Sequence, residues 1–344
     1  MTTKIGIDLG YANITLSNVA AEVHREPSVV MVDKSSRKII SVGNQAGSVN
    51  SDDVSDGMLV RPFKNGLLYS AEITKEVINH FVGFVKPAEK IRCIIGIPSD
   101  FLVKQTGELI EFFKSSGVTQ CYAVARPVAA LIGAGYSPNM SAVSVNIGAQ
   151  STEIAVLYKG KILSISREPV GGEDFDKAVK DHILEQGDMN VSLLVARTIK
   201  ENLGAVWQGK PSESIDIEGT LALTGSKVKM NISTEDIVGV FETPLKKFIL
   251  GVANVIKKIP LDAVEEIFEN GIVLSGGGAK LFGIDKMLSK VLGISVTLAA
   301  APMDCVAKGL SRINSILPIK MRAQDSDITD RIGKYYEAKT QNKK

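Results

Sequence analysis

The stretch SVNIGAQSTEIAVLYKG, from Ser144 to Gly160, decides the fold. It predicts an apolar strand, a short turn that begins at Gly148, and a second strand that returns beside the first. A glycine turn between two buried strands brings bare backbone close to a ligand and suits a phosphate group. Asn146 stands where such loops usually carry a carboxylate, so the stretch leaves open whether the loop binds a nucleotide, cleaves one, or does neither.

A second copy of this pattern lies near the N-terminus. IDLGYAN (Ile7 to Asn13) and VNIGAQS (Val145 to Ser151) share the order apolar, Asp or Asn, apolar, Gly, and they are 138 residues apart. That spacing is too long for a solenoid repeat and predicts two similar domains that face each other. A third loop, IVLSGGGAKLFGIDKML (Ile272 to Leu288), runs from a strand through three glycines into a helix, where unpaired N–H groups favour an anion. Together the three loops predict a nucleotide cleft shared by two domains.

The segments between these loops alternate between strands and helices, which is typical of an α/β core. KIGIDLG and ANITLSN predict a hairpin, PSVVMV (27–32) a third strand, and Ile91 to Ser99 a buried strand. Pro127 opens a helix in PVAALIGAG. From Ser141 three further strands are expected to form a meander, which a helix in GGEDFDKAVKDHIL follows.

Composition excludes several classes of protein. The 344 residues, 44% of them hydrophobic, are enough for two domains of about 150 residues each. Forty basic against 38 acidic residues are too balanced to indicate a nucleic-acid partner. Cys93, Cys121 and Cys305 are too scattered for a disulfide framework or a zinc site, which favours a reducing cytoplasm. Without a leader or an apolar run of about 18 residues, we expect neither export nor a membrane span.

Nine motifs occur in the order and at nearly the spacing of the bacterial actin MreB family. They are GIDLGYAN, EPSVV, VRPFKNGLL, RPVAALIGAG, VNIGAQSTEIAVL, VGGEDFDKAV, RTIKENLGAV, GIVLSGGGAKLFGIDKML and CVAKGL. From about Lys4 to Leu317 the chain therefore resembles that family, a branch of the superfamily of actins, sugar kinases and heat-shock ATPases. The resemblance implies an α/β, actin-like ATPase fold: two pseudo-repeated, ribonuclease H-like domains, each with a smaller inserted subdomain, and a nucleotide cleft between them.

The resemblance also implies limits for these parts. They are domain I over 1–140 with an insertion at about 29–71, domain II over 141–302 with an insertion at about 181–237, a helix over 303–318 that returns to domain I, and a flexible basic tail over 319–344.

The implied cofactors are ATP or ADP and Mg²⁺, with Asp8 holding the metal through water. The implied nucleotide-binding residues come from the two hairpins, from the start of the helix after the meander, from one site beside the adenosine, and from the triple-glycine loop. They are Asp8, Gly10, Tyr11, Ala12 and Asn13; Gly148, Ala149, Gln150 and Ser151; Gly171 and Gly172; Lys200 and Glu201; and Gly276, Gly277, Gly278 and Ala279.

Two residues at the expected catalytic positions lack the chemistry of hydrolysis. The reaction needs Mg²⁺ and a group that orients or deprotonates the attacking water. The glutamate that the resemblance places before Pro127 is Arg126, which stays protonated and cannot act as a base. The aspartate of the second hairpin is Asn146, whose amide adds no charge. We therefore expect a cleft that binds ATP or ADP with very weak or absent ATPase activity.

Several alternatives remain open at this point. Arg126 either pairs with a nearby acid or contacts the γ-phosphate, as a planar guanidinium suits phosphate oxygens. An ordinary ATPase would need another group to position water, such as Gln150. A third alternative is a monomeric scaffold that acts through partners.

The resemblance implies that the chain is its own partner, in head-to-tail filaments that form antiparallel double filaments. Divergent members with altered cleft residues occur in wall-less, helical swimming bacteria, where several copies share one cell. It thus implies a role in cell shape or motility, with other family members as partners.

Two segments are candidates for contact with the inner face of the cell membrane. Phe84 and Val85 form the tip of FVGFVKP, near the membrane-insertion loop that the resemblance implies; the alternative is that they belong to the core at a helix end. Ile328, Ile332 and Tyr335 fall on one helical face of the basic tail, which would suit lipid or a partner. The alternative there is a frayed, solvated tail.

Overall fold

Two five-stranded sheets dominate the computed structural model, which describes the chain except residues 1, 48–56, 65–66, 86–89, 319–327 and 335–344. The first sheet has the order β10-β9-β1-β2-β3, and the second has the order β13-β12-β11-β17-β18. The strands of the first are β1 (Thr2–Leu9), β2 (Asn13–Asn18), β3 (Val23–Pro27), β9 (Lys90–Ile97) and β10 (Gln120–Ala125). Those of the second are β11 (Ala142–Ile147), β12 (Thr152–Tyr158), β13 (Lys161–Glu168), β17 (Ile272–Ser275) and β18 (Val296–Leu298).

The two sheets share one topology. Each starts with an antiparallel meander of three strands, and each adds two parallel strands beside the first strand of that meander. Asp8 pairs with Thr15 on one side and with Gly96 on the other; in the second sheet Asn146 pairs with Glu153 and Ser275. The duplication predicted from the two glycine turns is therefore confirmed.

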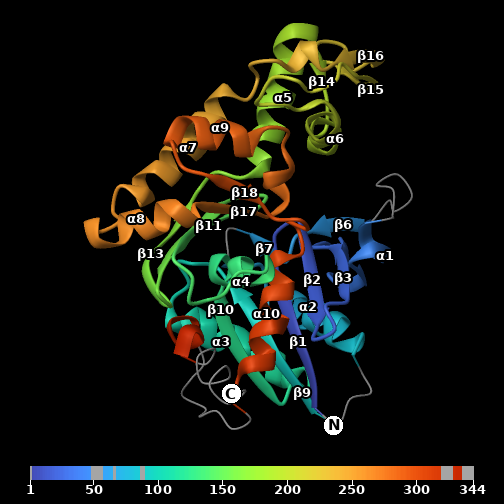
Figure 1. The fold of residues 1–344 in the computed structure, drawn as a ribbon. Coiled ribbons are helices and arrows are strands. Elements are labelled where there is room, and N and C mark those ends of the chain that lie inside the picture. The colour runs from blue at the N-terminus through green and yellow to red at the C-terminus, as the bar shows by residue number, and fades with distance from the viewer. Residues whose placement is uncertain (1, 48–56, 65–66, 86–89, 319–327, 335–344) are drawn as a thin grey trace.

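A layer of two helices separates the sheets. α4 (Arg126–Gly133) and α10 (Cys305–Ile316) pack on apolar residues of both sheets, and Figure 1 shows them between the two halves of the molecule. They approach closely because a Cβ atom at Gly133 would lie 1.7 Å from the carbonyl oxygen of Cys305, and one at Gly309 would lie 1.8 Å from that of Ala129. Only glycine allows backbones to meet at this distance.

The remaining helices cover the outer faces. α2 (Ala71–Gly83) and α3 (Val103–Ser115) bury their apolar sides against the first sheet. α7 (Glu242–Ile256), α8 (Leu261–Asn270) and α9 (Ile284–Leu292) do the same for the second. Alternate residues of β9 face both layers, since Cys93 packs with α2 and α3 while Ile94 packs with α4 and α10. Burial on both faces explains the apolar run over residues 93–97 of this strand.

Two small three-stranded sheets extend from the large ones. One has the order β14-β15-β16 and packs with α5 (Gly172–Gly187) and α6 (Leu193–Leu203) at the top of Figure 1. The other has the order β5-β4-β6. Their strands are β14 (Met189–Asn190), β15 (Ser214–Leu221) and β16 (Lys227–Ser233); and β4 (Val30–Asp33), β5 (Ile39–Val42) and β6 (Gly57–Val60). The short elements are α1 (Asn44–Gly47), β7 (Phe63–Lys64), β8 (Leu67–Leu68), η1 (Glu235–Ile237), η2 (Gly277–Lys280) and η3 (Thr329–Arg331).

The strand predicted at PSVVMV is confirmed over the second half of that stretch, but it lies outside the first sheet. Its third strand is β3, with the sequence VHREP, and Val30–Asp33 forms β4 of a small sheet instead. β3 gives no apolar alternation because it buries a charged residue: Glu26 is 5% exposed and accepts hydrogen bonds from His24 and His80.

The end of the described chain is packed rather than frayed. Ile328 donates its N–H to the carbonyl of Ala123, and the Thr329 hydroxyl accepts from the N–H of Ala125. Ile328 and Ile332 are buried against α4 and α10. The expected flexible tail is therefore wrong for residues 328–334, because they satisfy the polar groups of the edge strand β10. These two side chains are not available to lipid, and Tyr335 lies outside the described residues.

Among the described residues, no helix has the length and apolar character needed to cross a membrane.

Candidate functional site

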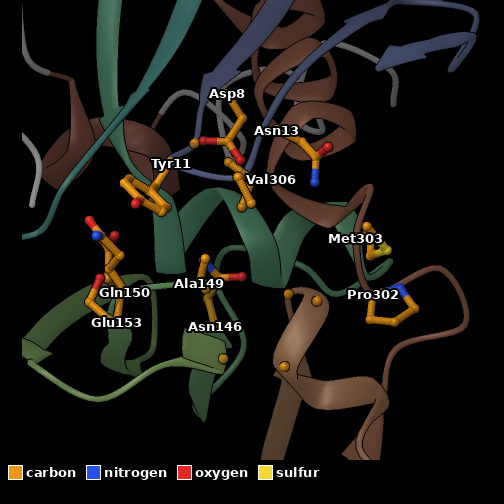
Figure 2. A pocket seen from close by; sticks show the side chains of 18 of the residues that line it. Asp8, Tyr11, Asn13, Asn146, Ala149, Gln150, Glu153, Pro302, Met303 and Val306 are labelled. Atoms are coloured by element: carbon orange, nitrogen blue, oxygen red, sulfur yellow. The ribbon is translucent and has the colours of Figure 1, made fainter. Parts of the chain in front are cut away.

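A cavity of about 580 Å³ lies where the two sheets face each other. Figure 2 shows Asp8, Tyr11 and Asn13 on one side of it, and Asn146, Ala149 and Gln150 on the other. This volume is in the range of sites for small ligands and cofactors. The predicted residues that line it are Asp8, Gly10, Tyr11, Ala12, Asn13, Arg126, Asn146, Gly148, Ala149, Gln150, Ser151, Gly172, Lys200, Glu201, Gly276, Gly277 and Gly278.

Two predicted residues stand behind the wall of the cavity. Gly171 supports the second hairpin, because a Cβ atom there would lie 2.6 Å from the carbonyl oxygen of Ala149. Ala279 is 1% exposed and packs in the core of the second sheet. Both shape the loops, and neither offers a side chain to a ligand.

The second hairpin is seated on the start of α5. The N–H of Gly148 donates across its own turn to Ser151, at 2.9 Å between N and O. The N–H of Gly172 donates to the carbonyl of Gly148 at 2.9 Å, and that of Glu173 to Ala149 at 2.7 Å. The turn is therefore fixed at both ends, which positions its backbone toward the cavity.

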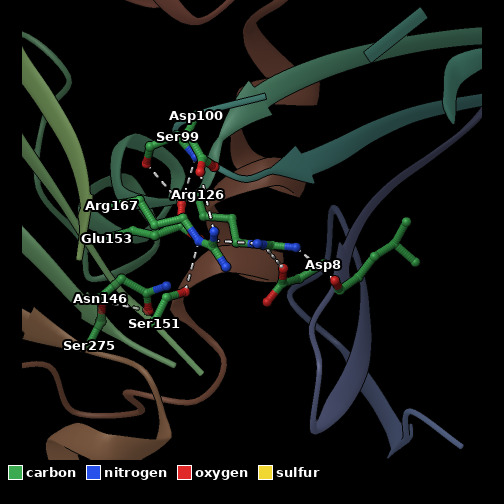
Figure 3. A network of polar contacts seen from close by, with 10 residues as sticks. Asp8, Ser99, Asp100, Arg126, Asn146, Ser151, Glu153, Arg167 and Ser275 are labelled. Atoms are coloured by element: carbon green, nitrogen blue, oxygen red, sulfur yellow. Dashed lines mark hydrogen bonds and ion pairs between the residues drawn. The ribbon is translucent and has the colours of Figure 1, made fainter. Parts of the chain in front are cut away.

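Arg126, the first residue of α4, holds the floor of the cavity together (Figure 3). Its Nε donates to Oδ1 of Asp8 at 2.9 Å, its Nη1 to Oε1 of Glu153 at 3.0 Å, and its Nη2 to the carbonyl of Leu9 at 2.7 Å. The side chain is only 14% exposed. Of the two interpretations of Arg126, the structure shows the ion pair with nearby acids. Pro127, next along α4, suits the first turn of a helix because proline offers no N–H.

Burial and charge act against each other in this cluster. Burial raises the pKa of Asp8, and the charge of Arg126 beside it offsets only part of that rise. Burial alone would lower the pKa of Arg126, but the charges of Glu153 and Asp8 outweigh it and raise that pKa. The guanidinium therefore stays charged, as arginine does in proteins.

Glu153 is a site residue that the sequence interpretation missed. It is 3% exposed, and its Oε2 accepts hydrogen bonds from the N–H of Ser99 at 3.0 Å and from the Ser99 hydroxyl at 2.9 Å. With Arg126 on Oε1, both of its oxygens are engaged. The signal was present, since Glu153 is a charged residue in the buried strand TEIAVLY and occupies the place in the second hairpin that Thr15 has in the first.

Two polar side chains next to this cluster are also engaged. Oδ1 of Asn146 accepts a hydrogen bond from the Ser275 hydroxyl at 3.2 Å. Arg167 donates from Nε to the Ser151 hydroxyl at 3.1 Å and from Nη1 to Asp100 at 3.2 Å. Arg167 belongs to β13, and Asp100 lies just after β9, so this ion pair joins the two halves of the molecule.

The far end of the cavity carries a second set of charges. Lys200 lies with its Nζ 2.5 Å from Oδ1 of Asp176 and donates to the carbonyl of Gly172 at 3.1 Å. Arg197 donates to the other oxygen of Asp176 at 3.2 Å. Lys210 lies over the ring of Phe282, 5.6 Å from its centroid. A planar ring with basic side chains around it suits an aromatic base and its phosphates.

The residues present do not fit the magnesium site expected at Asp8. Oδ1 of Asp8 is bound to a guanidinium, and a second cation at the same carboxylate would meet Arg126 within a few ångströms. The described residues contain no group of three or more His, Cys, Asp or Glu side chains placed to hold a metal ion. The expectation that Asp8 holds Mg²⁺ through water therefore stays a prediction, which the ion pair of Asp8 with Arg126 makes less favourable.

The two residues proposed for membrane contact differ. Phe84, just past α2, is 46% exposed, with its ring 3.9 Å from that of His24. Val85 packs against the core of the first sheet, as the alternative interpretation had it. Lys86 and Pro87 lie outside the described residues.

Known proteins resemble this chain over most of its length. The family model for the MreB/Mbl protein matches residues 2–320. The cell shape-determining protein Mbl of Bacillus cereus is 31% identical over 317 residues, covering 89% of this chain and 93% of Mbl. The cell shape-determining protein MreB of Escherichia coli is 27% identical, covering 90% and 92%.

Solved structures show the same fold. The crystal structure of MreB5 of Spiroplasma citri bound to ADP aligns with a TM-score of 0.87 at 22% identity, and covers 92% of this chain and 97% of that one. A chain of the MamK double helical filament aligns with a TM-score of 0.79 at 22% identity, covering 92% and 100%. With the family model, the duplicated sheets and the cavity between them in agreement, the chain belongs to the MreB/Mbl family and has the actin-like fold.

Proposed function

We propose that this chain is a cytoskeletal protein that assembles into actin-like filaments and binds ATP or ADP in the cavity between its sheets, with hydrolysis that is very weak or absent. Its relatives are named as cell shape-determining proteins. MreB5 of Spiroplasma citri was solved with ADP and with AMPPNP, and MamK as a filament. These support nucleotide binding and self-association, and a role in cell shape or motility follows as part of the proposal.

The ion-paired Arg126 carries the proposal of weak hydrolysis. A general base must accept a proton from the attacking water, and an arginine cannot do so. Asn146 is an amide, and Glu153 has both oxygens bound by Arg126 and Ser99. Losing general-base catalysis costs typically 10²–10⁴ in rate.

Gln150 is the remaining group that an ordinary ATPase would use. Its Nε2 donates to Oε2 of Glu173 at 3.1 Å, so its amide is turned to the start of α5. Figure 2 shows it among the residues that line the cavity. This supports the proposal of slow turnover over the alternative of normal turnover.

Phosphate release from polymerised protein tests the proposal. We expect the wild type to release no more phosphate than a nucleotide blank, and Arg126→Glu with Asn146→Asp to gain activity because a free carboxylate then faces the cavity. Arg167→Gln is the matched control, since it also removes a cation of the cavity wall but adds no carboxylate. Wild-type turnover at the rate of an ordinary bacterial actin would refute the proposal.

Pelleting and electron microscopy test the filament itself. In the presence of nucleotide, we expect the protein to pellet and to form double filaments. Mixing it with other family members of the same cell would show whether they copolymerise. Protein that stays in the supernatant at every concentration would favour the monomeric scaffold.

We also propose a peripheral contact with the inner face of the cell membrane through Phe84, because its ring is nearly half exposed at the end of α2. Co-sedimentation of wild type and Phe84→Asp with anionic vesicles measures it. Equal binding of the two proteins would exclude this side chain.

A further inference from the structure

Arg126 holds a fixed position between the two hairpins. Its guanidinium makes three hydrogen bonds, to Asp8, to Glu153 and to the carbonyl of Leu9, at 2.7 to 3.0 Å. One of these partners belongs to the first hairpin strand, and another to the second. The positive charge is therefore placed where the carboxylate of Asp8 enters the cavity (Figure 3).

The wall of the cavity carries more positive than negative side chains. Seven lining residues are basic and four are acidic. The basic residues are Arg25, Arg126, Arg167, Arg197, Lys200, Lys210 and Lys280, and the acidic ones are Asp8, Glu153, Asp176 and Glu201. In phosphate sites that use a divalent ion, the ion neutralises the oxygens of the phosphates. Several of these basic residues are ion-paired with acids, and the lining as a whole has three more basic than acidic residues, an excess that would favour a phosphate group without an ion.

A divalent ion at Asp8 would also be repelled. It would share the carboxylate with a guanidinium that is 14% exposed and held by three bonds, so neither cation could withdraw into water. Arg126 donates three of the five N–H groups of its guanidinium to protein oxygens, and the two that are left, one on each Nη, suit phosphate oxygens.

We propose that this cavity binds the polyphosphate of a nucleotide as a metal-free anion, with Arg126 as the built-in cation in place of a divalent ion. The inference rests on the proposed nucleotide binding and adds the chemical form of the ligand. It separates this chain from sites in which the metal–nucleotide complex is the ligand.

Nucleotide titrations in two buffers test the inference. Nucleotide-free wild type is titrated with ADP and with ATP by isothermal calorimetry, once in excess MgCl₂ and once in excess EDTA. We expect the two Kd values to agree within about threefold, since the ion is no part of the site. A loss of tenfold or more in EDTA overturns the inference and leaves nucleotide binding intact. Absence of binding in both buffers overturns the inference together with the proposed nucleotide binding.

Two variants locate the effect. Arg126→Gln should weaken binding in EDTA by tenfold or more and recover with MgCl₂, because Asp8 is then free to face a metal. Lys280→Gln removes a lining charge away from Asp8 and should weaken binding equally in both buffers. Equal behaviour of the two variants overturns the special role of Arg126.

A spectroscopic measurement needs no variant. Mn²⁺ replaces Mg²⁺, and its electron paramagnetic resonance signal reports whether the ion is free or bound. With wild type saturated with ADP, we expect the protein–ADP complex to bind no Mn²⁺. All Mn²⁺ that is not bound by ADP in solution should then give the signal of the free ion. A signal of bound Mn²⁺ in equal amount to the protein overturns the inference.

Discussion

Replacing Arg126 by glutamine removes the cation that contacts both Asp8 and Glu153, and we expect a marked loss of stability. The glutamine is shorter and uncharged, so it reaches at most one of the two carboxylates. Glu153 is the critical partner because its side chain is 3% exposed, whereas Asp8 is 18% exposed and borders the cavity.

The magnitude follows from the charge that is left behind. Removing one partner of a buried ion pair costs about 3–5 kcal/mol. Glu153 keeps its two hydrogen bonds from Ser99, and Asp8 gains access to water, so the lower end applies. We expect about 3 kcal/mol, which corresponds to a fall in melting temperature of roughly 6–12 °C for a domain of this size. Removing the second charge as well, in Arg126→Gln with Glu153→Gln, should restore about 1–2 kcal/mol of this loss.

The assay is thermal and urea unfolding of the four proteins of this double-mutant cycle. Far-UV circular dichroism reports the whole chain, and the fluorescence of Trp207, its single tryptophan, reports the region beside the cavity. A loss of less than about 0.5 kcal/mol in Arg126→Gln, or two single effects that simply add, would show that the ion pairs contribute little and that our reasoning is wrong.

Three further predictions concern other parts of the fold. Burial raises the pKa of Glu26, but hydrogen bonds from Asn44 and two histidines outweigh it and hold that pKa below 4.5. The stability that these hydrogen bonds give to the folded chain is complete above pH 4.5. It is lost as the pH falls through the lowered pKa of Glu26. Glu26→Gln should therefore lower the free energy of unfolding by about 1–3 kcal/mol at pH 7. In urea unfolding, the difference in free energy of unfolding between wild type and the variant should become smaller below pH 4.5. Gly133→Ala should lower the stability by about 3 kcal/mol or more in melting experiments, because α4 and α10 must separate to admit the methyl group. Gly107→Ala in α3 is the control, because a Cβ atom there meets nothing within 4 Å. It should be neutral or up to about 1 kcal/mol stabilising. Ile328→Ala should cost about 2–5 kcal/mol in urea unfolding, while no change would indicate the frayed tail.

Local signals predicted the large sheets. A glycine turn between two apolar strands is written in neighbouring residues, so Gly10 and Gly148 were enough to predict both hairpins and their duplication. β3 was not predicted because its sequence, VHREP, buries the charged residue Glu26. The partners that make this burial favourable are His80 of α2 and the N–H of Asn44 at the start of α1. A buried charge of this kind has no local pattern.

The ion pairs of the site could not be predicted for the same reason. The sequence indicates that Arg126 is unusual, and it places Asp8 and Asn146 at equivalent positions. It does not indicate that Glu153 turns toward Arg126, since the two residues belong to different elements, β12 and α4. Only the packing of α4 between the sheets brings them to 3.0 Å.

Polar and charged contacts that involve Arg126 hold the floor of the cavity between the two sheets together. Arg126 binds a carboxylate from each hairpin, Ser99 binds Glu153, and Arg167 binds Asp100, so charged and polar bonds of the protein itself cross the floor of the cavity. Buried ion pairs add little net stability over apolar packing, but they fix geometry, because breaking one leaves a charge unpaired. In a cavity whose two sides are joined mainly through contacts with a bound nucleotide, the relative position of the sheets would depend on how many phosphates the nucleotide has. Here bonds of the protein itself hold the floor, and under the proposed function we expect ATP and ADP to have less differential interaction with which to shift that position. We therefore propose that Arg126, where the resemblance implies a glutamate, both slows hydrolysis and weakens the link between nucleotide state and the relative position of the sheets.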